Sequence, residues 1–209
     1  LFSGSVKDPQ TQPLARVNVF ADDGADFYDH SSFTDGNGNY VAGALGGGAW
    51  SVEVDGDQPT VTNYVFSAGL STNLNVGQAV LHNFTALLTT NHITGYFRDA
   101  GSNPLTNVQI YAYANIGGNF YNTDAATDAG GTYSLNVVNG SWTVGVCCFC
   151  DNGSSGFCCP NTQNVIISNA NGVANFTSPG QIVITNSSAL PAGYDGDFFQ
   201  YQFGAVTCQ

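Results

Sequence analysis

One pattern of residues occurs twice in this chain, and this duplication limits the possible folds more than any other feature. Residues 34–40 read Thr-Asp-Gly-Asn-Gly-Asn-Tyr and are followed by Trp50, and residues 127–133 read Thr-Asp-Ala-Gly-Gly-Thr-Tyr and are followed by Trp142. Further segments align at the same offset of roughly 92 residues, which is the signature of a repeated structural unit. They pair Ser3–Asp8 with Thr94–Asp99, Val17–Phe20 with Val108–Tyr111, and Asn83–Thr85 with Asn175–Thr177. The sequence predicts two copies of one domain, at 1–90 and 91–188, and a C-terminal tail or extra strand at 189–209.

Alternating apolar and polar side chains indicate that each copy is built from β-strands. The alternation has the period of a half-buried strand and runs through Phe2–Lys7, Val17–Ala21 and Trp50–Val54. In each Thr-Asp motif two glycines follow within three residues of the Asp, which favours a tight turn because glycine adopts a positive φ without a steric clash. No segment of about ten or more residues keeps a helical period. The predicted fold class is therefore all-β.

The order of these motifs resembles the carboxypeptidase-regulatory-like domain, a prealbumin-like (transthyretin-like) β-sandwich found in tandem on secreted and cell-surface proteins. In the first copy the resemblance lies in the Ser-Gly-x-Val-x-Asp motif at Ser3, in Pro13-Leu14, in the turn motif, in Gly-x-Trp-x-Val-x-Val and in Asn83–Thr85. It implies two tandem Greek-key sandwiches of the Ig-like or prealbumin-like kind, in agreement with the spacing of strands and turns. The motifs are turn and core residues, so the resemblance implies a fold and says little about function.

The charge balance excludes several classes of partner. The 209 residues include 3 Lys and Arg against 15 Asp and Glu, which gives a formal net charge of −12. Nucleic acid and anionic membrane surfaces are excluded because binding them requires clustered basic side chains. No apolar run approaches the roughly 18 to 20 residues of a membrane span, so insertion into a membrane is not expected. The chain starts without Met or a signal peptide, and we expect a processed product that is extracellular or on the cell surface.

The cysteines favour a disulfide framework. They are Cys147, Cys148, Cys150, Cys158, Cys159 and Cys208. A thiolate metal cluster and free or intermolecular thiols are the alternatives, but adjacent cysteines do not match the spaced pairs of structural zinc sites. An even number of cysteines in an extracellular chain favours disulfides. Because neighbouring cysteines rarely bridge each other, we expect the first three to pair with the last three, which would tie the tail to the loop.

An acidic loop and the turn that follows it offer oxygen ligands for calcium, and no other cofactor is expected. The candidate ligands are Asp22, Asp23, Asp26, Asp29 and Asp35. Calcium would also relieve the repulsion of an acidic surface that has few basic partners. The alternative is a plain turn or a solvated loop, because the second copy replaces the acidic loop with Ile-Gly-Gly-Asn at residues 116–119.

Pairs of adjacent aromatic residues recur at matching loop positions, as Phe27-Tyr28 and Phe120-Tyr121. Two neighbouring side chains of a strand cannot both face the core, so one ring of each pair could stack on a sugar or anchor an interface. The alternative is a ring that lies over its own domain. In the tail, Phe199 and Tyr201 belong to an alternating, uncharged stretch that is suited to pairing with another strand.

Catalysis and covalent cross-linking find little support in the sequence. The three histidines, His30, His82 and His92, occur in no nucleophile or metal-ligand motif, so the chain is predicted not to be an enzyme. An internal Lys–Asn bond with an acidic catalyst would need a buried lysine, whereas alternation places Lys7 and Glu53 on polar strand faces. Candidate glycosylation sites are Asn83, Asn139, Asn152, Asn175 and Asn186, all in Asn-x-Ser/Thr sequences.

The scarcity of basic residues points to self-assembly. Sandwich proteins usually guard exposed strand edges with Lys, Pro or inward charges, and Lys7 is the only lysine in this chain. We therefore predict a non-enzymatic extracellular structural protein, a subunit of a surface filament that copies of the chain build by β-strand addition. The N-terminal strand or the tail would be the donor, unless the tail covers its own second domain. A carbohydrate-binding or adhesin module, with glycans as partners, is the alternative function.

Overall fold

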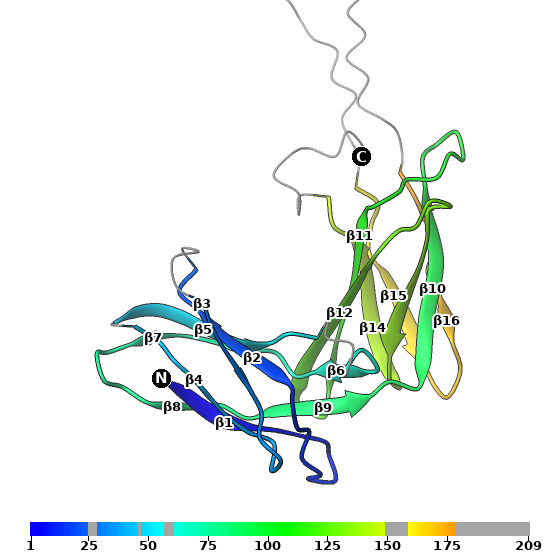
Figure 1. The fold of residues 1–209 in the computed structure, drawn as a ribbon. Coiled ribbons are helices and arrows are strands. Elements are labelled where there is room, and N and C mark those ends of the chain that lie inside the picture. Colours follow the sequence, from blue (N-terminus) through cyan, green and yellow to red (C-terminus); the bar gives the residue numbers. More distant parts are fainter. Residues whose placement is uncertain (25–28, 46, 57–60, 149–158, 179–209) are drawn as a thin grey trace, which may run out of the picture.

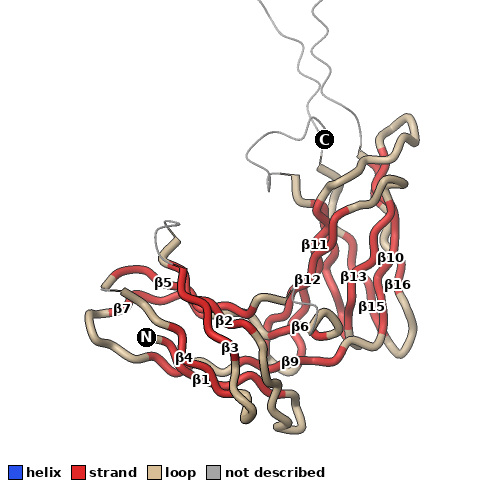
Figure 2. Tube along the Cα trace, in the orientation of Figure 1, coloured by secondary structure: helices blue, strands red, loops and turns tan. Residues whose placement is uncertain are grey.

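The computed structural model describes the chain except for residues 25–28, 46, 57–60, 149–158 and 179–209 (Figure 1). Its regular elements are β-strands, and the described residues contain no helix. Figure 2 shows the strands gathered into two units that meet at an angle. Each unit has two sheets, so the predicted all-β sandwich fold is confirmed.

The first sandwich contains a central N-terminal strand. Its strands are β1 (Phe2–Lys7), β2 (Asn18–Asp22), β3 (Asp29–Phe33), β4 (Asn39–Ala42), β5 (Gly48–Val54), β6 (Tyr64–Phe66), β7 (Leu70–Leu74), β8 (Val80–Leu81) and β9 (Phe84–Leu88). One sheet has the order β4-β1-β9-β6, with β8 also pairing with β1, and the other has the order β3-β2-β5-β7. Strand β1 is antiparallel to β4 on one side and parallel to β8 and β9 on the other. The prediction that the N-terminal strand could be donated to a neighbour is therefore wrong, because both of its edges are already paired.

The second sandwich repeats this order. Its strands are β10 (Asn91–Arg98), β11 (Gln109–Ile116), β12 (Asn119–Ala126), β13 (Thr132–Val137), β14 (Gly140–Val146), β15 (Gln163–Ile167), β16 (Gly172–Val173) and β17 (Phe176–Thr177). One sheet has the order β13-β10-β16, with β17 also pairing with β10, and the other has the order β12-β11-β14-β15. In both sandwiches the chain crosses between the sheets before and after the strand that follows the Thr-Asp turn, as in Greek-key sandwiches. Strand β6 has no counterpart among the described strands of the second sandwich.

Each sandwich encloses its own core, built from the inward-facing residues of alternating strands. Burial of these apolar side chains is the main force that holds the two sheets together. In the first sandwich the core includes Phe2, Val6, Val19, Trp50, Val52 and Phe84. In the second it includes Ile93, Phe97, Ile110, Leu135, Trp142 and Phe176. The two tryptophans of the chain therefore lie one in each core.

The repeated Thr-Asp motif is a turn whose side chains hold neighbouring segments together. Thr34 Oγ1 accepts a hydrogen bond from the Val17 N–H (2.9 Å), and one carboxylate oxygen of Asp35 accepts two from N–H groups inside the turn (2.8 Å each). Thr127 and Asp128 make the same contacts in the second copy. Hydrogen bonds within each turn lower the pKa of both carboxyl groups. The motif is thus explained by the fold.

The tyrosine that ends the motif forms a second device with a glycine and an asparagine. The Tyr133 hydroxyl donates a hydrogen bond to the Ala174 carbonyl (2.5 Å), and this carbonyl lies so close to Gly95 that a Cβ there would collide with it. The side-chain oxygen of Asn175 then accepts the backbone N–H of Tyr96 (3.2 Å). The first copy repeats the arrangement with Tyr40, His82, Gly4, Asn83 and Ser5.

Candidate functional site

The two sandwiches share a packed junction, which is formed by β6 and the start of β12. Val65 of β6 is 3% exposed and belongs to the core of the second sandwich, with Leu87 of β9 packed beside it. The Ala68 N–H donates a hydrogen bond to the Phe120 carbonyl (2.8 Å), and Ser67 forms an isolated β-bridge with Tyr121. Side chains and backbone of the first sandwich therefore continue into the second, which joins them more firmly than a linker would.

A cleft of about 450 Å³ lies beside this junction. Its lining comes from both sandwiches and carries the carboxylates of Glu53, Asp55 and Asp124, and none of the described lining residues is basic. Asn122 and Asn136 add amide groups from the second sandwich. Such a lining disfavours anionic ligands, because the carboxylates repel them. Its mixture of acidic and amide groups does not by itself indicate one ligand.

An aromatic row occupies the outer face of the sheet next to the cleft. We define it as Tyr111, Tyr113 and Phe120. The ring centroids of Tyr111 and Tyr113 are 6.3 Å apart with an interplanar angle of 9°, and those of Tyr113 and Phe120 are 5.5 Å apart with an angle of 24°. Tyr113 is 38% and Phe120 45% exposed. The three rings follow one another in nearly parallel planes at the surface.

Strand alternation and register explain how the aromatic row forms. Ile110, Ala112 and Ala114 of β11 face the core, so the residues between them face outward. On β12, Phe120 pairs with Asn115, one step beyond Tyr113 on the same face. Phe120 was among the residues predicted from the sequence and the two tyrosines were not, although the alternation from residue 109 to 116 indicates that they face outward.

The two members of the predicted aromatic pair Phe120-Tyr121 differ in their exposure to solvent. Phe120 is exposed, but Tyr121 is 2% exposed and packs against the junction, with its hydroxyl hydrogen-bonded to the Thr85 side chain. Burial raises the pKa of Tyr121. Tyr121 therefore contacts the first sandwich of its own chain and is not a surface platform. Phe27 and Tyr28, as well as Phe199 and Tyr201, lie outside the described residues.

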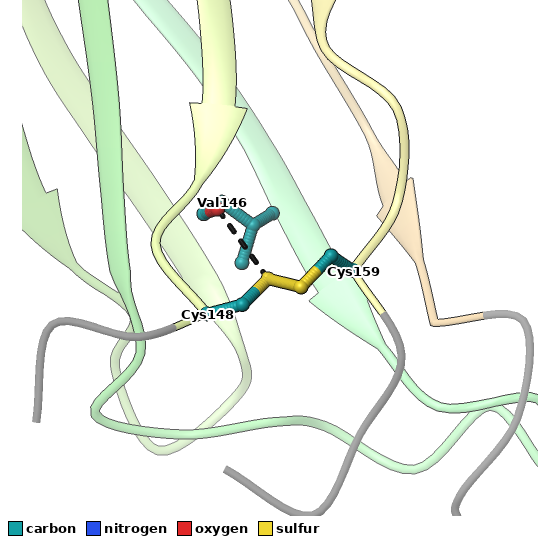
Figure 3. The surroundings of a disulfide bond; sticks show 3 residues. All are labelled: Val146, Cys148 and Cys159. Atoms are coloured by element: carbon teal, nitrogen blue, oxygen red, sulfur yellow. Dashed lines mark hydrogen bonds between the residues drawn. A yellow bond between two sulfur atoms is a disulfide. The ribbon is translucent and has the colours of Figure 1, made fainter. Parts of the chain in front are cut away.

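A disulfide closes the segment between β14 and β15. Cys148 and Cys159 are bonded, with their Cα atoms 5.9 Å apart, and Figure 3 shows the Cys148 sulfur near the Val146 carbonyl oxygen, at 3.5 Å. Cys147 is disulfide-bonded as well. Cys148 thus pairs across the loop and not with its neighbour. Cys150, Cys158 and Cys208 lie outside the described residues, and the pairing predicted for them stays a prediction.

The strand register divides the proposed calcium ligands. Asp22 pairs with Asp29 at one end of the β2–β3 hairpin, whereas Asp35 follows the other end, where Asn18 pairs with Phe33. With a rise of about 3.3 Å per residue the two ends are too far apart for one ion. Asp35 is therefore removed from the candidate site, and its carboxylate serves its own turn. Asp26 lies outside the described residues, and in the rest of the described chain no three His, Cys, Asp or Glu side chains come together to hold a metal.

Three of the candidate glycosylation sites have structural roles. The side-chain oxygens of Asn83 and Asn175 accept backbone N–H groups of β1 and β10. Asn139 exchanges two hydrogen bonds of 2.7 Å with Asn169. Asn152 and Asn186 lie outside the described residues. Modification of any of the five stays a prediction.

Lys7 and Glu53 belong to different sheets of the first sandwich. Lys7 pairs with Thr85 in one sheet, and Glu53 pairs with Phe20 in the other and lines the cleft. The residues on either side of Glu53 are Val52 and Val54, and both pack in or against the core. Because side chains alternate along a strand, Glu53 faces outward. This separation rules out Glu53 as the acidic catalyst of a bond between Lys7 and Asn83.

The described edge strands carry no lysine or arginine. The described sheets end at β3, β4, β6, β7, β12, β13, β15 and β16, and none of these strands contains Lys or Arg. Lys7 and Arg98 lie on the central strands β1 and β10. On β15, Ile166 is 78% exposed, and no described strand pairs with the outer edge of β15. The part of the chain seen here also contains no helix that could cross a membrane.

No family model and no curated protein matches this chain. Solved structures that resemble it include the Bacillus anthracis TIE protein, at 13% identity and a TM-score of 0.36 over 84% of this chain and 32% of that one. The Streptococcal ancillary pilin has 11% identity and a TM-score of 0.35, over 85% of this chain and 61% of that one. The shaft pilin spaA from Lactobacillus rhamnosus GG has 12% identity and a TM-score of 0.33, over 91% of this chain and 98% of that one. This chain thus spans less than two thirds of the first two, and its function is inferred from its own geometry.

Proposed function

We propose that this protein is a non-enzymatic structural subunit of an extracellular or cell-surface filament, in which neighbouring copies pair strand edges. The finer family assignment, to carboxypeptidase-regulatory-like domains, belongs to the same proposal. The observation that carries it is the outer edge of β15, with which no described strand pairs and where a strand without charge presents Ile166 at 78% exposure. Natural sandwiches blunt such edges with Lys, Pro or bulges because an open ladder of N–H and C=O groups recruits another strand.

The C-terminal tail is the donor in this proposal. The N-terminal strand β1 is paired on both sides, which leaves the tail at residues 189–209 as the predicted segment without a place in either repeat. A tail that pairs with β15 of the next copy makes a head-to-tail contact, and such contacts build open fibres unless the rotation closes a ring. The packed junction supports this role, because it lets force pass from one sandwich to the other through Val65 and Tyr121.

The experiment compares the mass and shape of four chains by light scattering and negative-stain microscopy. They are the full chain, Ile166→Lys, Val76→Lys and a chain truncated after residue 188. Val76 is 84% exposed between β7 and β8 and provides the matched control for adding a lysine. We expect filaments from the full chain and from Val76→Lys, and monomers from Ile166→Lys and from the truncated chain.

Three results would count against the proposal. Filaments of unchanged length from Ile166→Lys would show that β15 is not the acceptor, and filaments from the truncated chain would exclude the tail as donor. Melting temperatures of all four chains must agree within a few degrees, so that a lost filament is not a lost fold. Monodisperse monomers of the full chain at high concentration would refute the assembly function altogether.

A further inference from the structure

The outer face of the second sandwich carries a surface that the filament proposal does not use. The aromatic row of Tyr111, Tyr113 and Phe120 faces outward, with successive ring centroids 6.3 and 5.5 Å apart. Exposed aromatic rings in series are costly on a soluble surface, because each keeps apolar area in contact with water. A ligand that covers the rings would remove this cost.

The fold itself does not require the aromatic row. In the first sandwich the positions that match Tyr111 and Tyr113 hold Phe20 and Asp22, and Glu53 pairs with Phe20. In the second sandwich Gly145 pairs with Tyr111. The Tyr111 ring reaches across the neighbouring strand over Gly145, where a Cβ would collide with it. The two copies share their core and differ at these two positions, so the pair Tyr111 and Tyr113 is not repeated in the described part of the first sandwich.

The groups around the row indicate the chemistry of its ligand. Asn122 and Thr143 pair with Tyr113 on either side, and the Thr143 hydroxyl donates a hydrogen bond to Asn164 (3.0 Å). Gln109 Nε2 donates to Asp124 (2.6 Å) at the end of the face. Strands β11, β12, β14 and β15 carry no Lys or Arg. The face thus offers rings, amides and hydroxyls with a single negative charge.

We propose that this face binds a neutral carbohydrate chain. The apolar C–H faces of the sugar rings would pack against the exposed parts of the aromatic row, where Tyr113 is 38% and Phe120 45% exposed. The sugar hydroxyls would exchange hydrogen bonds with Asn122, Thr143 and Asn164, the few placed polar groups that orient a ligand on an apolar surface. Acidic polysaccharides and nucleic acids are excluded by Asp124 and by the net charge of −12.

The test is a calorimetric titration of the full chain with each polysaccharide of a defined panel. The panel contains soluble β-linked glucan, α-linked glucan, mannan and galactan as neutral chains, and polygalacturonate as an acidic one. We expect saturable binding to at least one neutral chain. Tyr113→Ala should weaken that binding at least tenfold, whereas Tyr113→Phe should keep it, because the ring remains.

Phe33→Ala provides the matched control, since Phe33 is 61% exposed on β3 of the first sandwich. It should leave the affinity unchanged. The proposal is overturned if no neutral chain of the panel binds, if only polygalacturonate binds, or if Tyr113→Ala binds as tightly as the full chain. It is also overturned if Tyr113→Ala abolishes self-association while no sugar binds, because the face would then be an interface between copies. Ile166→Lys separates this outcome from failure of the filament proposal, since it alters β15 and leaves the aromatic row in place.

Discussion

Tyr133 and its counterpart Tyr40 show how single residues fix the duplicated fold. Each hydroxyl donates to a carbonyl on the neighbouring strand segment, and a glycine opposite that carbonyl leaves room for it. Burial raises the pKa of both hydroxyls, so both stay protonated and able to donate. The Gly, Tyr and Asn residues therefore recur at matching positions in the sequence because the same hydrogen-bonded arrangement forms in both copies.

Replacing Tyr133 by Phe should lower the free energy of unfolding of the second sandwich by about 1 to 3 kcal/mol, because the Ala174 carbonyl loses its partner. Denaturant unfolding followed by the fluorescence of Trp142, in a chain with Trp50→Phe, measures this sandwich separately. Tyr113→Phe is the control, because Tyr113 is an exposed tyrosine on the outer face. Equal stability of Tyr133→Phe and the parent chain would show that the hydroxyl contributes nothing.

Because of the same two tyrosines, we expect the folded protein to lose stability at alkaline pH. Their pKa is raised in the folded state, so the unfolded chain releases these protons first, at about pH 10. Their contribution is complete below that pH and decreases as the pH rises above it. Melting temperatures from pH 8 to 11 should therefore fall at the alkaline end, and Tyr40→Phe with Tyr133→Phe should fall less steeply. Parallel curves for the two chains would contradict this origin.

At the scale of elements, the second sandwich differs from the first by a disulfide next to its edge strand. The bond between Cys148 and Cys159 follows β14 and precedes β15, so it fixes the entry into β15. A bond over a sequence separation of 11 restricts the unfolded chain and should stabilise this sandwich. The first sandwich has no cysteine at all. Strand β15, whose start this disulfide fixes, is also the edge strand with which we propose that a neighbouring copy pairs.

Replacing both Cys148 and Cys159 by Ser should destabilise the second sandwich by on the order of 2 to 4 kcal/mol. Single-tryptophan chains measure the effect, since Trp50 reports on the first core and Trp142 on the second. The Trp142 transition should move to lower denaturant while the Trp50 transition stays in place. A shift of equal size in both transitions would mean that the sandwiches unfold as one unit and that the bond supports the whole molecule.

Strands and turns could be predicted from the sequence because their causes are local. Alternation identified β1, β2 and β5, and the Thr-Asp turns marked where one strand ends and the next begins. The role of β6 could not be predicted, because residues 61–66 look like any apolar strand and only tertiary packing places Val65 in the other core. The separation of Asp35 from Asp22 follows from hairpin register, which composition does not reveal.

At the scale of the molecule, two features decide what the chain can build. The junction carries packing and backbone hydrogen bonds from one sandwich into the next. The outer edge of β15, with which no described strand pairs, is the edge that we propose a neighbouring copy uses. The aromatic row lies on an outer face and the edge of β15 at the end of the same sheet. A filament with this subunit would therefore display one row of rings from every copy.

Amide hydrogen exchange of β15 at low and high protein concentration tests the proposed edge pairing most directly, because strand addition protects backbone N–H groups. The account predicts that amides of residues 163–167 exchange at least tenfold more slowly in the assembled protein. Ile166→Lys should show no such protection at the same concentration, and Val76→Lys should behave like the parent chain. Exchange rates in β15 that do not change with concentration, in a chain that still assembles, would contradict the account.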